Sequence, residues 1–202
     1  MKTKLGILFL LTLAGAALAA PRTFNFKDPK GINNVGFRLD APLEAINGNA
    51  SGVSGTVTFD PDNPGATTGK IMVTASSLML PNAVQRQHML GDKWLDAAKY
   101  PEISFESKAF KNVRTAGDTT TADVTGTFIL KGVTQEITVP VKLTYLKGKL
   151  GKRVPNQKGD LLVIRADFAI KRSDFSINPG RFEDEVADSI ELNLSIAGAA
   201  PE

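Results

Sequence analysis

Apolar and polar residues alternate along most of the chain, which is the period of a half-buried β-strand. In each alternating segment the apolar residues share one face. These residues are Val35, Phe37 and Leu39; Val53, Gly55, Val57 and Phe59; Ile71, Val73 and Ala75; Ile103 and Phe105; Val124, Gly126, Phe128 and Leu130; Ile137, Val139, Val141, Leu143 and Tyr145; and Ile190, Leu192, Leu194 and Ile196. Turn-forming residues separate the segments. The pattern predicts an all-β, antiparallel protein.

Two segments depart from this pattern. Residues 161–164 are apolar on both faces, which predicts a strand with a covered outer side, and a terminal segment is the expected cover. Residues 82–98 are the one stretch with a helical character, interrupted by Gly91 and bracketed by Pro81 and Pro101. We therefore expect two short helical turns that lie across one end of the strands, where a lid or a ligand gate belongs. The stretch 147–159 is predicted to be a solvated loop.

The long strands bear on the architecture. Antiparallel strands in one domain either stack as a sandwich or close as a barrel. The segment at 137–145 spans roughly 30 Å at the usual rise per residue, which favours a tall barrel. We find no internal repeat and no linker, so residues 20–202 are predicted to be one domain.

The first residues predict export. Lys2 and Lys4 precede an apolar run at residues 5–13, and Ala17-Leu18-Ala19 matches a cleavage site. Residues 1–19 are therefore predicted to be a signal peptide cut after Ala19; the alternative is an uncleaved anchor, for which the run is short. No later segment is apolar enough to cross a membrane, so a periplasmic or secreted protein is expected.

Composition narrows the function classes. The 202-residue chain has no Cys, so its stability must come from a core and not from disulfides. It has 24 basic and 21 acidic residues, and removing Lys2 and Lys4 leaves 22 basic residues and a formal charge of +1. Because no basic stripe with interleaved aromatics is present, nucleic-acid binding is not expected.

Catalytic and metal-binding patterns are weak. His88, the only His, could act as a base with Ser76, Ser77 or Ser173 as nucleophile, but no Ser lies in a Gly-x-Ser-x-Gly elbow. A structural role for His88, capping or hydrogen bonding within the helical segment, is favoured over a ligand contact. Trp94, the only Trp, is expected to anchor that segment, a role that is compatible with lining a channel.

Metal ligands are also scarce. With one His and no Cys, a metal site would need carboxylates almost alone. The acidic run at 183–185 is interpreted as a solvated turn, and the Asp60-Pro-Asp62-Asn63 stretch lacks the remaining ligands of a calcium loop. No metal or cofactor is predicted.

Three blocks of residues carry a resemblance to a known family. The first runs from Arg86-x-His88-x-Leu90 through Trp94-Leu95-Asp96 to Tyr100-Pro101-x-Ile103-x-Phe105-x-Ser107. The second is Val124-x-Gly126-x-Phe128-x-Leu130-x-Gly132-Val133-Thr134 with Ile137-x-Val139-Pro140-Val141. The third is Lys171-Arg172-Ser173-Asp174-Phe175-x-Ile177 with Val186-x-Asp188-x-Ile190-x-Leu192. In this order the blocks resemble the YceI-like proteins, which are exported bacterial polyisoprenoid-binding proteins. Asn33-Asn34 departs from the family's usual His-Ser, and Ser176 replaces a usual Gly.

The resemblance implies an elongated eight-stranded antiparallel lipocalin-like barrel with a short helical segment between two strands. It implies a channel that holds a polyisoprenoid, an isoprenoid quinone or a similar long-chain amphiphilic lipid, with Gly55, Ala75 and Gly126 leaving room for it. No catalytic residue is implied. The expected ligand-binding residues combine inward-facing strand positions with the helical segment: Phe37, Val57, Phe59, Ile71, Val73, His88, Leu90, Trp94, Phe105, Phe128, Val139 and Val141.

Other interpretations stay open at this point. The chain could be an envelope structural or stress protein with a fully packed core, or a hydrolase that uses His88. The expected partner is the lipid, and a homodimer is left open. The ligand's identity is not encoded in any single motif.

Overall fold

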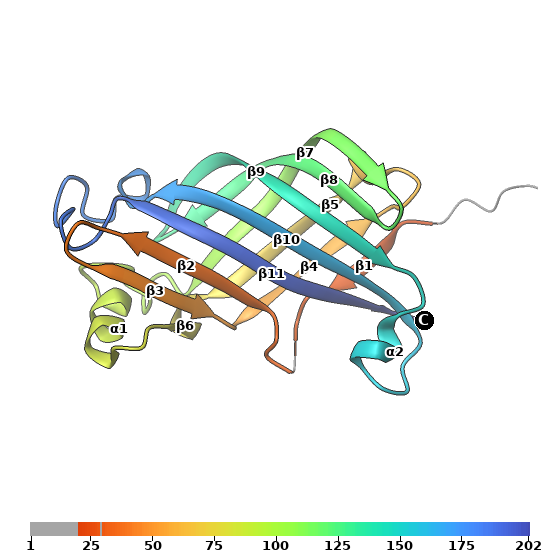
Figure 1. The fold of residues 1–202 in the computed structure, drawn as a ribbon, viewed down its shortest axis with the longest axis horizontal. Helices are drawn as coiled ribbons and strands as arrows, with labels where there is room; N and C mark the ends of the chain where they lie inside the picture. The colour runs from red at the N-terminus through yellow and green to blue at the C-terminus, as the bar shows by residue number, and fades with distance from the viewer. Residues whose placement is uncertain (1–19, 29) are drawn as a thin grey trace, which may run out of the picture.

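The computed structural model describes residues 20–28 and 30–202 (Figure 1), so the predicted signal peptide at 1–19 lies outside the described residues. The strands are β1 (Arg22–Asn25), β2 (Asn34–Asp40), β3 (Ala45–Ala50), β4 (Val53–Phe59), β5 (Thr68–Thr74), β6 (Leu78–Met79), β7 (Glu102–Ala116), β8 (Thr119–Leu130), β9 (Val133–Leu146), β10 (Gly159–Lys171) and β11 (Ser189–Pro201). The helices are α1 (Ala83–Leu90) and α2 (Leu150–Arg153), and the 3₁₀ turns are η1 (Pro64–Ala66), η2 (Ala75–Ser77) and η3 (Arg172–Phe175).

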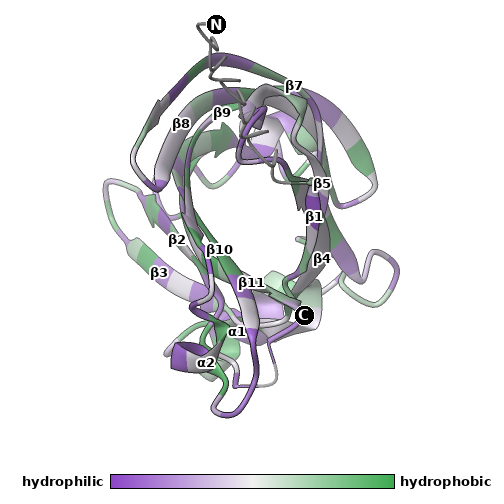
Figure 2. Ribbon diagram, turned by 90° about the vertical axis from the view of Figure 1, so that its right-hand side faces the viewer, coloured by the Kyte–Doolittle hydropathy of each residue, from purple (hydrophilic) through white to green (hydrophobic). Residues whose placement is uncertain are grey.

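Eight of the described strands form a closed antiparallel barrel. Their order is β1-β4-β5-β7-β8-β9-β10-β11, and the pairing of Asn25 with Ala199 joins β1 back to β11. Figure 2, viewed from the end that carries α2, shows these strands as a ring. The predicted eight-stranded barrel is confirmed, and its long axis is evident in Figure 1.

Strand β11 changes partner along its length, which makes the two ends of the barrel different. Near Ala199 it pairs with β1, whereas residues 191–195 pair with β2, and β3 and β6 continue the sheet from there. We call these the α2 end and the α1 end after the helix that lies at each (Figure 1). The alternation missed β1, β3 and β6, which are four, six and two residues long.

The helical segment follows the prediction closely. Asn82 caps α1, because its Oδ1 accepts hydrogen bonds from the backbone N–H groups of Val84 and Gln85 at 2.9 and 3.1 Å. The helix ends at Gly91, and turns lead from there to β7. Arg86 fastens the helix to the sheet, since its guanidinium donates to the carbonyl oxygens of Leu78 and Ser76, each at 2.8 Å.

The prediction of a single helical region is wrong, because α2 lies in the connection that was interpreted as a solvated loop. Leu150 of α2 is completely buried, and the helix lies against β10 and β11. The helix thus lies against the strand that contains the doubly apolar stretch at 161–164, for which a terminal segment was the expected cover. Leu162 and Ile164 belong to the interior core, while Leu161 is buried on the outside. Four residues of helix are too short to leave a periodic signal in the sequence.

Among the described residues, no helix has both the length and the apolar character that a membrane crossing requires.

Candidate ligand cavity

A cavity of about 480 Å³ occupies the barrel interior. Its walls are almost entirely apolar and come from every strand except β1, with α1 and the segment after it at one end. The volume falls within the range of about 300–1,000 Å³ that ligand pockets have, and an eight-stranded barrel is the size that can hold one small ligand. The interior is therefore not a fully packed core.

Most of the residues predicted from the sequence line this cavity. They are Phe37, Val57, Ile71, Val73, His88, Trp94, Phe105, Phe128, Val139 and Val141. Phe59 does not line it, because its ring packs into the core at the α2 end beside Tyr145, with 5.8 Å between ring centroids. Leu90 packs instead against the cluster of Ala50, Ala75 and Leu78 beneath α1. Contact of the lining residues with a ligand stays a prediction.

Several lining residues were missed, although the sequence carries their signal. Leu192 and Leu194 of β11 belong to a recognised alternation but were not chosen. On β10, Ala166, Phe168 and Ile170 alternate with exposed residues and also line the cavity. This alternation was not recognised because residues 161–164, at the start of the strand, are apolar on both faces.

The expectation that Gly55, Ala75 and Gly126 leave room for a ligand is wrong, since none of them lines the cavity. A Cβ on Gly126 would lie 2.5 Å from the Phe105 ring, so this glycine makes space for the ring. Gly55 has φ of +124° and a Cβ there would lie 2.1 Å from the carbonyl oxygen of Lys70. That glycine serves the close approach of β4 to β5. Ala75 packs under α1.

Polar side chains gather where the cavity reaches the α1 end. Glu44, Gln85 and His88 line it there, and Gln85 Nε2 donates to Glu44 Oε2 at 3.2 Å. This contact links the turn between β2 and β3 to α1. His88 is exposed, and its imidazole forms no hydrogen bond among the described residues. The expected hydrogen-bonding role of His88 is wrong, and Asn82 and Arg86 fix the segment instead.

Arg172 is the charged residue that is buried in the cavity wall. Its guanidinium lies 5.9 Å from the centre of the Trp94 ring. All of its N–H groups donate to backbone carbonyl oxygens, which belong to Ile177, Asn178, Arg181, Val186 and Ala187. No described carboxylate pairs with it. Arg172 therefore holds the loop at 177–187 in place and has no donor left for a ligand.

The α2 end is closed by side chains. Phe24 and Phe26 are fully buried there and pack with Phe59, Leu162 and Ile196. The Phe24 ring meets the Tyr145 ring edge-on, with 6.1 Å between centroids. These side chains fill the barrel between β1 and β11, so the cavity ends above them.

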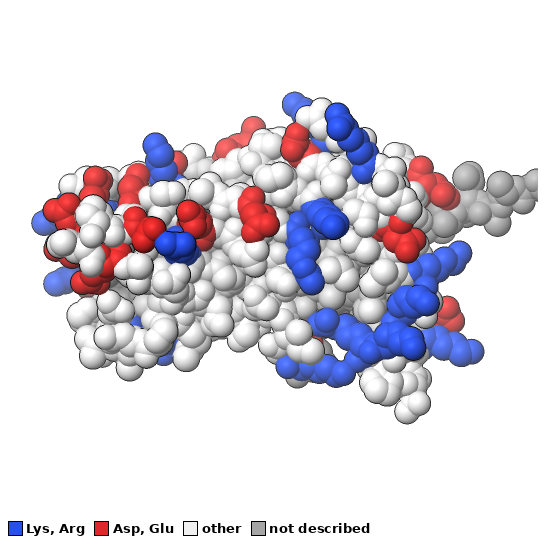
Figure 3. All heavy atoms as spheres, in the orientation of Figure 1, with Lys and Arg blue, Asp and Glu red and all other residues white. Residues whose placement is uncertain are grey.

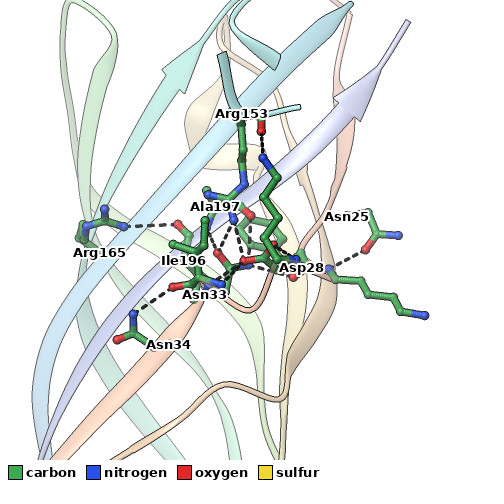
Figure 4. A network of polar contacts seen from close by, with 12 residues as sticks. Asn25, Asp28, Asn33, Asn34, Arg153, Arg165, Ile196 and Ala197 are labelled. Atoms are coloured by element: carbon green, nitrogen blue, oxygen red, sulfur yellow. Dashed lines mark hydrogen bonds and ion pairs between the residues drawn. The ribbon is translucent and has the colours of Figure 1, made fainter. Parts of the chain in front are cut away.

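A polar network fastens the β1–β2 connection across this closed end (Figure 4). Asn33 is buried; its Nδ2 donates to the carbonyl oxygens of Phe26 and Ala197, and its Oδ1 accepts from the N–H of Ala197 at 2.8 Å. Arg153 of α2 donates to Asn33 Oδ1 and forms an ion pair of 2.8 Å with Asp28. Burial alone would raise the pKa of Asp28, but the backbone N–H groups of Asn33, Lys30 and Ile32 and the charge of Arg153 outweigh burial and lower it.

A second network surrounds Asp160 on β10. Its carboxylate forms an ion pair of 2.5 Å with Arg22 and accepts hydrogen bonds from Tyr145 Oη and the N–H of Gly148 at 2.7 Å each. These partners outweigh the effect of burial and lower the pKa of Asp160. Burial and the neighbouring carboxylate raise the pKa of Tyr145 to about 12. Both networks hold β1 and α2 onto the barrel.

The described residues bring no catalytic or metal-binding group together. Ser173 Oγ donates to Asp188 at 2.8 Å and Ser77 Oγ donates to the carbonyl oxygen of Thr74 at 2.7 Å, so neither faces His88 as a nucleophile would. The run at 183–185 is an exposed turn. Within residues 20–28 and 30–202, no three His, Asp or Glu side chains gather to hold a metal ion.

These features define a closed antiparallel β-barrel with an internal apolar cavity that reaches the surface at one end. The chain belongs to the family of proteins with a YceI-like domain, whose model matches residues 30–197.

Relatives and solved structures agree with this assignment. The chain is 28% identical over 200 residues to Protein YceI of Escherichia coli O17:K52:H18, covering 98% of this chain and 97% of that one. The crystal structure of Burkholderia cenocepacia BcnA superposes with a TM-score of 0.66 at 23% identity, covering 82% of this chain and 95% of that one. A polyisoprenoid-binding domain from Saccharophagus degradans superposes with a TM-score of 0.64 at 12% identity, covering 90% and 100%. At these identities the two solved structures establish the shared fold.

Proposed function

We propose that this chain is an exported binding or carrier protein for a polyisoprenoid, an isoprenoid quinone or a similar long-chain amphiphilic lipid. The observation that carries the proposal is the apolar cavity of about 480 Å³ enclosed by the barrel. Each methylene group that moves from water into such a cavity contributes about 0.8 kcal/mol. The polyisoprenoid-binding domain of the same fold supports this ligand class. Export rests on the charged, apolar and A-x-A pattern of residues 1–19.

The two ends of the cavity suggest how such a ligand lies. The aromatic core at the α2 end leaves no outlet, so the tail points toward Phe24 and Phe59. The head group lies at the α1 end, beside Glu44, Gln85 and His88. Because the donors of Arg172 are all engaged, the head group is held by these polar side chains and by water.

Binding without chemistry is the proposed activity. His88 contacts the head group in this proposal and abstracts no proton. A His88→Ala variant is expected to retain lipid. If that variant instead lost a hydrolytic activity that the wild-type protein shows on an isoprenoid ester, the binding-only assignment would be wrong.

The test is native mass spectrometry and lipid extraction of the purified protein, combined with a variant that fills the cavity. Ala166 faces the cavity from β10, and Ala169 on the same strand is exposed. We expect Ala166→Phe to lower the amount of bound lipid at least tenfold and Ala169→Phe to leave it unchanged. Wild-type protein that carries no lipid, and that takes up no isoprenoid from cyclodextrin, would disprove the proposed function.

A further inference from the structure

Exposed large hydrophobic side chains are unevenly distributed over the described part of the chain. Leu43 is 73% exposed, Val84 is 60% exposed and Phe182 is 51% exposed. Leu43 lies in the turn between β2 and β3, Val84 in the first turn of α1, and Phe182 in the loop at 177–187. All three segments lie at the α1 end (Figure 1).

Direct contacts join these three segments around the polar end of the cavity. The N–H of Leu43 donates to the carbonyl oxygen of Asp184 at 2.9 Å. Gln85, which follows Val84, donates a hydrogen bond to Glu44, which follows Leu43. The Phe182 ring lies 5.9 Å from the ring of Trp94, which lines the cavity. We call Leu43, Val84 and Phe182 the rim.

The backbone at Phe182 is constrained. Its φ is +60°, a left-handed conformation that a bulky residue rarely adopts. Its carbonyl oxygen accepts from the N–H groups of Val186 and Glu185 at 2.7 and 3.2 Å. Arg172 fixes the same loop through the carbonyl oxygen of Arg181. These contacts fix the loop with the Phe182 ring half exposed, and strained residues of this kind concentrate at functional sites.

We propose that the rim docks on the surface of a lipid bilayer and holds the mouth of the cavity against it while a lipid enters or leaves. This inference rests on the proposed function. A bilayer is the favoured partner because each rim residue adjoins a residue that lines the apolar cavity (Glu44, Gln85 or Trp94), and a tail that crossed water would lose the hydrophobic stabilisation of every methylene. Amphipathic surfaces that lie on a membrane insert Leu, Phe and similar side chains in this way.

The charges near the rim specify the kind of bilayer. Glu44, Glu183, Asp184 and Glu185 are exposed beside the rim together with Arg181, and Figure 3 shows Asp and Glu, with some Lys and Arg among them, on the visible face of this end. On the same face, Lys and Arg gather around α2, at the opposite end. An anionic surface would repel the rim and attract the α2 end. The rim therefore suits a zwitterionic surface.

The experiment is flotation of the full protein with phosphatidylcholine vesicles. We expect the wild-type protein to float with the vesicles. Each of Leu43→Ser, Val84→Ser and Phe182→Ser is expected to lower the partition coefficient by about tenfold. The free energy of transferring one such side chain from water into an apolar environment is at least as large as the free energy that a tenfold change represents. Ile32→Ser is the matched control: Ile32 is 57% exposed but lies in the β1–β2 connection, which is fastened to α2 through Asp28. It is expected to leave flotation unchanged.

Lipid composition gives an independent readout. Adding phosphatidylglycerol to the vesicles is expected to weaken binding at low salt, and high salt is expected to remove the difference because it screens surface charges. Binding that instead requires phosphatidylglycerol, and that is lost on replacing Lys149 and Lys152 by Ser, would show that the α2 end docks and would overturn the proposal.

Loading with geranylgeraniol from cyclodextrin separates this inference from the proposed function. Rim variants that load normally but no longer float support the inference. Wild-type protein that loads but does not bind phosphatidylcholine vesicles, or a triple rim variant that still binds them, overturns it and leaves the proposed function standing. Wild-type protein that takes up lipid neither from cyclodextrin nor from vesicles would reject the proposed function itself.

Discussion

The α2 end and the α1 end close the same barrel by different means. At the α2 end, Phe24 and Phe26 are completely buried and fill the space between the strands. At the α1 end, α1 and the loop at 177–187 bridge the strands and a cavity remains beneath them. Both ends contain a buried hydrophobic cluster, since Phe128, Phe175 and Ile177 pack together at the α1 end, but among the described residues that line the cavity, charged side chains lie only at the α1 end.

The two ends also differ in how their charged side chains are paired. At the α2 end, carboxylates with lowered pKa values pair with Arg153 and Arg22 and fasten β1 and α2 directly to the barrel. At the α1 end, Arg172 has no carboxylate partner among the described residues and organises backbone carbonyls. From this difference we expect the segments at the α1 end, α1 and the loop at 177–187, to open locally at a lower free energy than the α2 end does.

Truncation of Phe26 should produce the largest effect. The ring is buried and lies against Gly198, where a Cβ would come within 2.6 Å of it. Phe26→Ala is expected to lower the free energy of unfolding by about 4 kcal/mol, because it opens a cavity in a packed region. Phe168→Ala is the control at the ligand cavity: this half-buried ring already borders empty space, so we expect a loss of less than about 2 kcal/mol. Urea denaturation measures both, and equal losses would contradict the comparison.

Replacing Arg172 should loosen the α1 end. Arg172→Lys keeps the charge but has three donors, so carbonyl oxygens of the loop lose their partners, and we expect a loss of about 3 kcal/mol. Hydrogen exchange should become faster at 177–187 and stay unchanged in β1. Arg181→Lys is the matched control, because only its backbone oxygen takes part in this contact. Uniform loss of protection over the whole barrel would show that the two ends are not separable.

The carboxylate of Asp160 should make the α2 end sensitive to acid. Because the folded pKa of Asp160 is lowered, its stabilisation is present above the unfolded value of about 3.9 and is lost as pH falls toward the folded value. Asp160→Asn is expected to cost about 2 kcal/mol at neutral pH and to flatten the stability curve below about pH 4. Equilibrium unfolding at several pH values measures this. If the free energy of unfolding of Asp160→Asn fell below pH 4 as steeply as that of the wild-type protein, this ion pair would not have the proposed role.

Tyr145 makes the complementary prediction at high pH. Its folded pKa is raised to about 12, so the neutral hydroxyl stabilises the fold below the unfolded pKa near 10, and this contribution is lost as pH rises through 12. Tyr145→Phe should remove this alkaline loss of stability. Spectrophotometric titration at the tyrosinate absorbance, with Tyr100 as the other tyrosine, measures the shift directly.

The smallest effect is expected from the cap of α1. Asn82→Ala removes the acceptor for two N–H groups and should lower the free energy of unfolding by about 1 kcal/mol. The loss should appear as faster hydrogen exchange in α1. Asn82→Asp keeps the acceptor oxygen and should restore protection of α1 against hydrogen exchange. Unrestored protection would show that the cap is not what stabilises α1.

Much of the barrel could be predicted from the sequence. The alternation at 124–130 and 137–145 marked two neighbouring strands, and the Lys131-Gly132 turn between them has positive φ at both residues. Ten of the predicted lining residues were found from the same period and from the helical segment. Phe59 failed because alternation reports which face a residue occupies and not how far along the barrel the cavity extends.

The remaining errors have physical causes as well. The helix α2 is too short to show a period, and it is held by one buried residue, Leu150. The role of Arg172 depends on carbonyl oxygens that lie between five and fifteen residues away along the chain. No sequence pattern specifies where backbone oxygens will converge.

The sequence by itself determined the class of fold and the inward face of each long strand, because the side-chain period of a strand is two and a buried face must be apolar. Only the tertiary structure decided which inward side chains meet and which leave a space. That outcome depends on the partner change of β11, which brings β1 with Phe24, and Phe26 just after it, to the α2 end and leaves β2, β3 and α1 to cover the other end. A cavity is a property of how strands are joined around a ring, and no single strand contains it.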